Sequence, residues 1–285
     1  MTSFIVTVLA HNEERRIGAC LNSLLAETGD FPIHVVVNGS SDSTAEIAGS
    51  FGARVIIHNY AQGGKARSWN RYVLDELQAY SGAHIFADGD AEIVPGSLAA
   101  LVKALADNPA ANASAGQPRN GRNVEYYQTD QRRTHGMFGD LYALRGTFLA
   151  RIKAAHIRLP EDLIGDDGLI GALAKTDLTN EDNWSDDRLI VCPNAGFLCE
   201  PVNLFSPHTW VMQYKRMINY SVRYYQNQII TAIMRGPGPV GLPTLLSDYY
   251  QDWLGRFVPR SGLKNIWVDR QALAHMKAMA IKRGK

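Results

Sequence analysis

The chain has few cysteines, no long apolar run and no marked excess of charge of either sign. Its three cysteines, Cys20, Cys192 and Cys199, lack the spacing of a zinc finger, so a reducing compartment is expected. No segment approaches the roughly 20 consecutive apolar residues of a membrane-spanning helix. The formal net charge of +1 argues against nucleic acid as a partner. We therefore expect a cytoplasmic protein that binds no nucleic acid.

Several common functional motifs are also missing. The stretch Gly63-Gly64-Lys65-Ala66 has part of the phosphate-loop pattern, but Asn59 replaces its first glycine and Ala66 its final Ser or Thr. The segment from Asp88 is not a calcium loop, because Ile93 occupies the position that requires glycine. The chain also has no dinucleotide fingerprint after its first expected strand, no nucleophile elbow and no His-Glu-x-x-His motif.

What the chain does have is an alternation of strand and helix patterns over its first half. The N-terminal residues lack the basic region of a signal peptide, so we expect them to form a first strand. Apolar runs predict strands at residues 4–10, 33–37, 55–57 and 84–87, with later strands at 141–144, 189–191 and 199–202. This alternation is typical of the α/β class, with a Rossmann-like, mostly parallel sheet that is flanked by helices.

Local signals indicate where some helices begin. Ser43 and Glu46 have the spacing of a capping box, and Pro95 suits the first position of a helix. Residues 108–123 carry no clear pattern.

The C-terminal part differs from the first half. A long amphipathic helix is expected at residues 211–233, and the Gly-Pro-rich residues 236–239 end it. We therefore expect an α/β domain over residues 1–208, followed by a C-terminal helical region over residues 209–285.

Basic residues predominate at the C-terminal end. After Gly255, Asp269 is the single acid, against Arg256, Arg260, Lys264, Arg270, Lys277, Lys282, Arg283 and Lys285. Apolar residues are interleaved with them, namely Trp267, Leu273, Met276, Met279 and Ile281. Such a helix lies on an anionic membrane surface, or else its apolar stripe packs on the protein while the charges face water. The sequence leaves both interpretations open, so peripheral contact with the inner face of a membrane is one hypothesis.

The most informative stretch is residues 84–92, where a short apolar run ends in Asp88-Gly89-Asp90. The run predicts a buried parallel strand, so both acids would lie at its carboxyl end, where open α/β sheets bind ligands. Two carboxylates so close together repel each other unless a cation lies beside them, and such oxygen ligands suit Mn²⁺ or Mg²⁺. The alternative for an isolated Asp-Gly-Asp is a solvated turn.

Polar motifs also follow other expected strands and helix starts, in a fixed order. They are His11-Asn12-Glu13-Glu14, Asn38-Gly39-Ser40-Ser41-Asp42, Gly64-Lys65-Ala66-Arg67 with Asn70, Asp88-Gly89-Asp90, and Asp166-Asp167. Over roughly the first two-thirds of the chain, this series resembles the family-2 glycosyltransferases of the GT-A fold. The resemblance implies an enzyme that moves a sugar from a UDP- or GDP-sugar to a glycan or lipid-linked acceptor, in glycolipid or surface polysaccharide assembly.

The resemblance also implies roles for individual residues. Lys65 and Arg67 would face the donor diphosphate. Asp90 would bind Mn²⁺ or Mg²⁺, Asp88 would contact the ribose or the metal, and His208 is a candidate for completing the metal site. The loops after the first two strands would hold the nucleoside, through Ala10, Asn12, Glu13 and Asn38.

The acidic pair Asp166-Asp167 resembles the pair that supplies the catalytic base in this family. We expect Asp167 to accept the proton of the acceptor hydroxyl as it attacks C1, which inverts the anomeric configuration. Both acids also suit the cap of the helix that follows. Asp186-Asp187 is a rival pair in an expected loop.

On the acceptor side, Gln213 and Arg216 resemble the Gln-x-x-Arg-Trp motif of polymerising family members, although Met217 stands in place of the Trp. Because those members also carry membrane helices, we expect transfer of a single sugar here. Two alternatives remain open: a sugar nucleotidyltransferase on a related fold, and a non-catalytic protein that binds a nucleotide-sugar.

Overall fold

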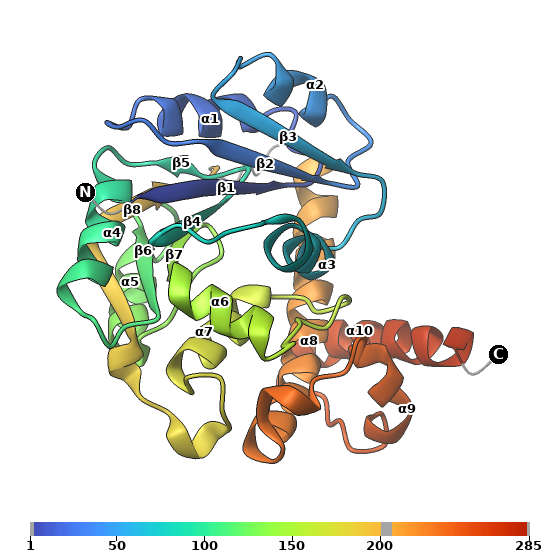
Figure 1. Ribbon diagram of the computed structural model, residues 1–285. Coiled ribbons are helices and arrows are strands. Elements are labelled where there is room, and N and C mark those ends of the chain that lie inside the picture. Colours follow the sequence, from blue (N-terminus) through green and yellow to red (C-terminus); the bar gives the residue numbers. More distant parts are fainter. Residues whose placement is uncertain (1–2, 201–206, 284–285) are drawn as a thin grey trace.

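The computed structural model describes residues 3–200 and 207–283, which form a sheet with helices on both faces (Figure 1). The eight-stranded sheet has the order β3-β2-β1-β4-β7-β6-β8-β5. The strands are β1 Phe4–Ala10, β2 Ile33–Asn38, β3 Val55–Tyr60, β4 Ala83–Asp88, β5 Glu92–Ile93, β6 Ala113–Pro118, β7 Leu141–Arg145 and β8 Leu189–Leu198. The expected α/β class is confirmed.

The direction of the strands decides which residues meet at the edge of the sheet. β3, β2, β1 and β4 are parallel, so their carboxyl ends lie at the same edge. β7 runs antiparallel to β4, and Leu141 pairs with Ala87. The residues just before β7 therefore lie at the edge where β4 ends.

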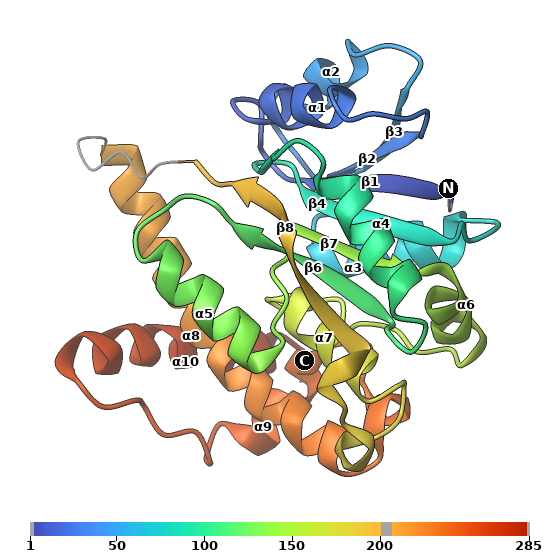
Figure 2. The same ribbon diagram turned by 90° about the vertical axis from the view of Figure 1, so that its left-hand side faces the viewer.

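Helices cover both faces of the sheet (Figure 2). They are α1 Ile17–Leu25, α2 Thr44–Gly49, α3 Lys65–Trp69, α4 Ser97–Asp107, α5 Val124–Thr134, α6 Gly146–Ala154, α7 Asp166–Lys175, α8 Pro207–Arg235, α9 Tyr250–Trp253 and α10 Leu263–Arg283. Apolar residues of α1, α2 and α4 pack in one cluster with one face of the sheet, while those of α3, α6, α7, α8 and α10 pack with the other. Along β4, Phe86 faces the second cluster and its neighbours Ile85 and Ala87 face the first, as the two-residue period of a strand requires.

The residues without a clear pattern contain β6, a fully buried strand in the middle of the sheet. Its sequence, Ala-Ser-Ala-Gly-Gln-Pro, consists mostly of small residues and has no apolar alternation, although all six residues are buried. The polar groups are satisfied inside the protein, as where the Ser114 hydroxyl donates to the Leu101 carbonyl over 3.0 Å. Tertiary packing therefore produces a strand that the local sequence pattern does not predict.

The expected strand at residues 189–191 is longer than predicted. β8 continues through Pro193 and Asn194, which are exposed and are residue types common in turns. Cys199 and Glu200 lie after β8 and outside any strand, so the prediction for residues 199–202 is wrong there, and residues 201–202 lie outside the described chain.

Two predicted helix starts need correction. α4 begins at Ser97 after Gly96, which has a φ of 83°, so Pro95 lies in the preceding turn. The Ser43 side chain makes no capping hydrogen bond within the described residues. Asp42 takes that role, because its carboxylate accepts the Thr44 amide over 3.1 Å.

The expected C-terminal helices are present, and they pack on the α/β core. α8 begins at Pro207, and its buried Val222, Tyr225 and Ile229 join the same cluster as α7 and the sheet. Ala272 and Met276 of α10 are fully buried in that cluster. Within residues 3–200 and 207–283, no helix has the length and apolar content to span a bilayer.

Candidate active site

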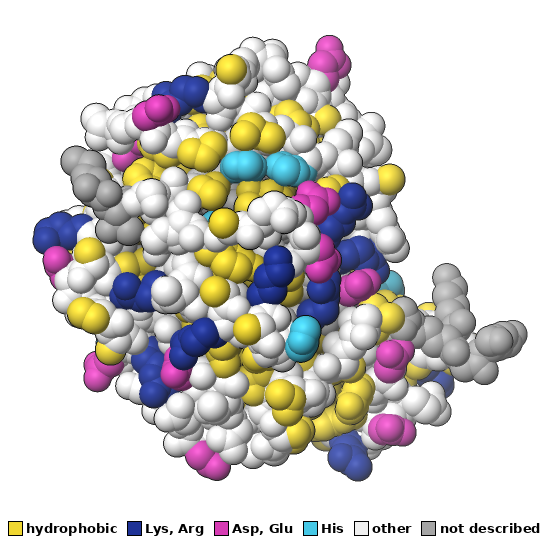
Figure 3. Space-filling model, in the orientation of Figure 1, with side chains coloured by type: hydrophobic (Ala, Val, Ile, Leu, Met, Phe, Trp, Pro, Cys, Tyr) yellow, Lys and Arg dark blue, Asp and Glu magenta, His cyan; other side chains and the backbone are white. Residues whose placement is uncertain are grey.

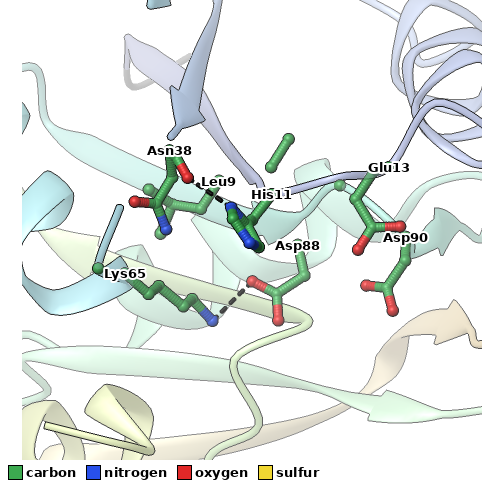
Figure 4. Close-up of a pocket in the computed structure, with 10 residues that line it drawn as sticks. Leu9, His11, Glu13, Asn38, Lys65, Asp88 and Asp90 are labelled. Carbon is green, nitrogen blue, oxygen red and sulfur yellow. Dashed lines mark hydrogen bonds and ion pairs between the residues drawn. The ribbon is translucent and has the colours of Figure 1, made fainter. Parts of the chain in front are cut away.

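A cavity of about 380 Å³ opens at the carboxyl edge of the sheet (Figure 4). It is lined by Leu9, Ala10, His11, Glu13, Asn38, Gly64, Lys65, Asp88, Gly89 and Asp90. The parallel strands β1, β2 and β4 thus bring together residues that are up to 81 positions apart, counting from Leu9 to Asp90. Most of the residues predicted to hold the donor surround this one space.

The end of β4 carries Asp88, and a tight turn presents Asp90 one residue beyond Gly89. A Cβ added at Gly89 would lie 2.8 Å from the Cβ of Ala10. Only glycine therefore lets this turn lie against the end of β1. As predicted, the two acids lie at the carboxyl end of a buried strand.

A third acid, Asp140, lies beside them and was missed in the sequence. Its carbonyl accepts the Asp88 amide over 3.3 Å, because β7 starts at the edge where β4 ends. The available signal was an acid directly before the predicted strand at residues 141–144. That signal becomes informative only when β7 is known to be antiparallel.

The carboxylates of Asp88, Asp90 and Asp140 form the cluster that fits a metal ion. One oxygen from each lies within 4.8 Å of the others, and all three side chains are half-buried. Three carboxylate oxygens are the ligands that Mn²⁺ and Mg²⁺ prefer, and such ions usually complete their shell with water and substrate phosphates. The donor set therefore fits a hard divalent cation.

Lys65, the first residue of α3, provides positive charge at the same place. Its ammonium lies 2.6 Å from one Asp88 oxygen and 3.7 Å from one Asp166 oxygen. Figure 4 shows the lysine side chain extending toward the Asp88 carboxylate. Burial by itself would lower the pKa of Lys65, but the Asp166 and Asp88 carboxylates raise it well above its ordinary value.

The acids exceed the nearby positive charge, and their pKa values reflect it. Burial raises the pKa of Glu13 to about 7, with a further contribution from Asp90. Burial also raises the pKa values of Asp88, Asp140 and Asp166, although Lys65 opposes the shift at each. An additional cation in this cavity would relieve the repulsion.

The loops after β1 and β2 are tied to each other. The His11 ring lies 2.6 Å from the Asn38 carbonyl through Nδ1, and the Asn12 side-chain oxygen accepts the Ser41 amide over 2.9 Å. Asn12 has a left-handed φ of 56°, which asparagine tolerates better than most residues. These contacts hold the two predicted nucleoside loops at a fixed separation.

Arg67 and Asn70 connect α3 to the segment before α7. Arg67 Nε donates to the Glu161 carboxylate over 2.8 Å, so its charge is already paired. The Asn70 amide exchanges two hydrogen bonds with the backbone of Leu159, at 2.7 and 3.0 Å. Asn70 is therefore a structural residue in this arrangement, whereas Lys65 is the cation that lines the cavity.

Asp166 and Asp167 begin α7, and both are buried. One Asp167 oxygen lies 3.0 Å from Arg223 Nη2 of α8, a contact that the sequence did not indicate. The arginine crosses Gly165, where a Cβ would collide with the guanidinium group, and Gly165 also needs its positive φ of 86°. The helix start, the glycine and α8 together fix the orientation of the Asp167 carboxylate.

The remaining predicted residues occupy different places. Arg216 of α8 is exposed, it is not among the residues that line the cavity, and its charge lowers the pKa of Glu13. Gln213 is half-buried one turn earlier, and the side chain of His208 lies outside the described residues. In the rival pair, Asp186 instead forms an ion pair with Lys175 at 2.8 Å.

Comparison with known proteins identifies similar chains. Residues 5–160 match the family model described as "Glycosyl transferase family 2". Among solved structures, a mannosyltransferase from Pyrobaculum calidifontis in complex with GDP-Man and Mn²⁺ has 21% identity and a TM-score of 0.62, covering 100% of this chain and 76% of that one. No curated protein sequence matches the chain significantly.

Two further solved structures are similar. TarS from S. aureus in complex with UDP-GlcNAc has 16% identity and a TM-score of 0.55, covering 98% of this chain and 81% of that one. Glucosyl-3-phosphoglycerate synthase from Mycobacterium tuberculosis, in complex with Mn²⁺, UDP and phosphoglyceric acid, has 20% identity and a TM-score of 0.54. That comparison covers 85% of this chain and 80% of the other.

Proposed function

Because the chain belongs to glycosyl transferase family 2 and has the GT-A fold, we propose that it transfers one sugar from a nucleoside-diphosphate sugar to an acceptor hydroxyl with inversion of configuration. The observation that carries this proposal is the position of Lys65. Its ammonium lies between Asp88 at the end of β4 and Asp166 at the start of α7. Donor-side and acceptor-side groups are thus within a few ångströms of one ammonium ion.

In the proposed reaction, Asp167 accepts the proton of the acceptor hydroxyl while the oxygen attacks C1 of the sugar. The diphosphate leaves from the opposite face, which inverts the anomeric centre. Lys65 offsets the negative charge that grows on the leaving group. Mn²⁺ or Mg²⁺ held by Asp88, Asp90 and Asp140 would supply further positive charge for the diphosphate.

The ligands of the similar structures support the choice of donor. They include GDP-Man, UDP-GlcNAc and UDP, two of them with Mn²⁺. We propose a UDP- or GDP-sugar here, with its nucleoside between the loops that carry Ala10, Asn12, Glu13 and Asn38. Family membership argues against both the nucleotidyltransferase and the non-catalytic binding protein. A glycan or lipid-linked acceptor, in glycolipid or surface polysaccharide assembly, remains the proposed biological context.

The stereochemistry gives a direct test that does not require the natural acceptor. A donor is first found by thermal shift with a panel of UDP- and GDP-sugars and Mn²⁺, since a bound ligand raises the unfolding temperature. Slow donor hydrolysis, with water as acceptor, should then release the sugar in the opposite anomeric configuration. Proton NMR, recorded before the sugar mutarotates, distinguishes the two anomers. Initial release of the retained anomer would rule out the single-displacement mechanism.

A second part of the proposal is peripheral contact of α10 with an anionic membrane surface. Three of the five apolar residues noted in its sequence pack internally, since Met276 is buried and Leu273 and Met279 lie against the core. Trp267 and Ile281 remain 51% and 53% exposed, beside the exposed basic residues Arg270 and Lys277. Basic and acidic side chains are interspersed on the face shown in Figure 3, so overall charge does not explain such contact.

Vesicle binding tests this contact. The full-length protein should co-sediment with vesicles that contain anionic lipid at low salt and dissociate at high salt, because the attraction is screened over about 10 Å at 0.1 M. Arg270→Glu/Lys277→Glu should weaken binding more than tenfold, since each basic residue contributes about 1 kcal/mol. Lys103→Glu on α4, where Lys103 is also exposed, is the matched control. Failure of the wild type to sediment at low salt would place the acceptor in solution.

A further inference from the structure

Lys65 and a divalent cation in the three-carboxylate cluster would compete for the same group, the Asp88 carboxylate. Asp88 is one of the three carboxylates that fit a divalent cation, and it is also the closest partner of Lys65, at 2.6 Å. The ammonium lies against the turn that carries Asp140, because a Cβ at Gly139 would be only 2.8 Å from Lys65 Nζ. The lysine charge is therefore next to the cluster, where it opposes the arrival of a second cation.

Buried carboxylates stabilise the Lys65 ammonium in its present position. Its second partner, Asp166, is only 4% exposed at the side chain, and Lys65 itself is 29% exposed. Breaking such a buried pair by removing one partner leaves a carboxylate without a counter-charge, which is costly. A divalent ion alone must either share the Asp88 carboxylate with this ammonium, whose charge repels it, or displace the ammonium.

The lysine can move to another anion that lies within reach. Lys65 and Gly64 line the cavity where the proposed donor diphosphate would lie, and Lys65 is the first residue of α3. Lysine carries its charge on a flexible four-carbon stem, so its ammonium can reach a phosphate that lies in the same cavity. Arg67 is held by Glu161, so it does not compete for this role in the present arrangement.

We propose that Lys65 is a resident cation that occupies Asp88 until the donor diphosphate draws it away, so that the divalent cation and the nucleotide bind cooperatively. The inference rests on the proposed function and adds the order of events at its cation site. When the ammonium moves to the diphosphate, Asp88 becomes available to the divalent ion. The divalent ion then neutralises the excess negative charge of the carboxylates. Linkage requires the effect to be reciprocal, with each ligand strengthening the binding of the other by the same factor.

Calorimetry of the full-length protein with Mn²⁺ tests this coupling. Lys65→Met keeps most of the side-chain stem and removes the charge. Without nucleotide, this variant should bind Mn²⁺ about tenfold more tightly than the wild type, because Asp88 is unoccupied. With saturating UDP or GDP this difference should largely disappear, because the ammonium has then left Asp88 in the wild type as well. A difference that depends on the nucleotide in this way distinguishes a competing cation from a residue that only maintains the fold.

Two additional variants complete the experiment. Lys65→Gln replaces the methionine variant if that one does not fold, and it carries the same expectation. Lys103→Met removes an exposed lysine, paired with Asp107 on α4, and should leave Mn²⁺ binding unchanged. If Lys65→Met or Lys65→Gln binds Mn²⁺ alone no more tightly than the wild type, the resident-cation role is wrong. A wild type that binds no nucleotide would overturn the proposed donor class, while the Mn²⁺-only comparison still decides the role of Lys65.

Discussion

Replacement of Asp167 by Asn is expected to lower the rate of sugar transfer by about 10²–10⁴-fold, the usual cost of losing a general base. Asparagine keeps the shape of the side chain but cannot accept the proton of the acceptor hydroxyl. Donor affinity should be preserved, because the carboxylate of Asp167 pairs with Arg223, whereas Lys65 and Asp88 line the cavity. Single-turnover rates and donor binding, measured on the same preparation, separate the two effects.

The rival acidic pair provides the matched control for this experiment. Asp187→Asn changes an exposed carboxylate in the short helix Asp186–Arg188, beside the Asp186–Lys175 ion pair. It should leave transfer within a factor of about two, as surface substitutions usually do. If Asp187→Asn or Asp166→Asn is inactive while Asp167→Asn transfers at the wild-type rate, the base has been assigned to the wrong residue.

Replacement of Asp90 by Ala is expected to remove the dependence of nucleotide binding on Mn²⁺. Substitution of residues that only support metal ligands typically costs about 10–100-fold in metal affinity, so the loss of a direct ligand should exceed about 100-fold. The fold should survive, because Asp90 is half-buried at the turn after β4 and repels its acidic neighbours. Calorimetry of UDP or GDP binding, with and without Mn²⁺, measures the effect.

Asp140→Ala should behave like Asp90→Ala if the third carboxylate is a metal ligand. Asp130→Ala on α5, which removes an acid from an exposed ion pair with Arg133, is the control and should leave binding unchanged. An Asp90→Ala protein with wild-type affinity for the nucleotide in Mn²⁺ would contradict the assignment of the cation to this cluster. Wild-type behaviour of Asp140→Ala alone would limit the ligand set to Asp88 and Asp90.

The Asp90 and Asp167 substitutions test two different groups of charged residues in the candidate site. Burial, with a contribution from Asp90, raises the pKa of Glu13 to about 7, and burial raises the pKa of Asp88 even though Lys65 lies beside it. The Asp167 side has its own counter-charge in Arg223. Loss of Asp90 should therefore act on cation and donor binding, and loss of Asp167 on the proton transfer to the base.

The sequence by itself determined which residues at the strand ends surround the cavity. Parallel strands place their carboxyl ends at one edge, so the polar residues that follow β1, β2 and β4 had to meet once the alternation of strand and helix was recognised. That reasoning required no contact information, and it brought Ala10, Asn38 and Asp88 to a common cavity.

Only the tertiary structure decided which additional residues join them. Asp140 reaches the cluster because β7 is antiparallel to β4, and strand direction is not encoded in the residues beside it. Arg223 meets Asp167 because α8 packs against the start of α7, a pairing between residues 56 positions apart, counting from 167 to 223. β6 was not predicted because its mostly small residues carry no apolar alternation, and packing in the sheet rather than local propensity makes them a strand. Local patterns determine what a segment prefers, whereas strand direction and helix packing depend on how the whole chain excludes water from its core.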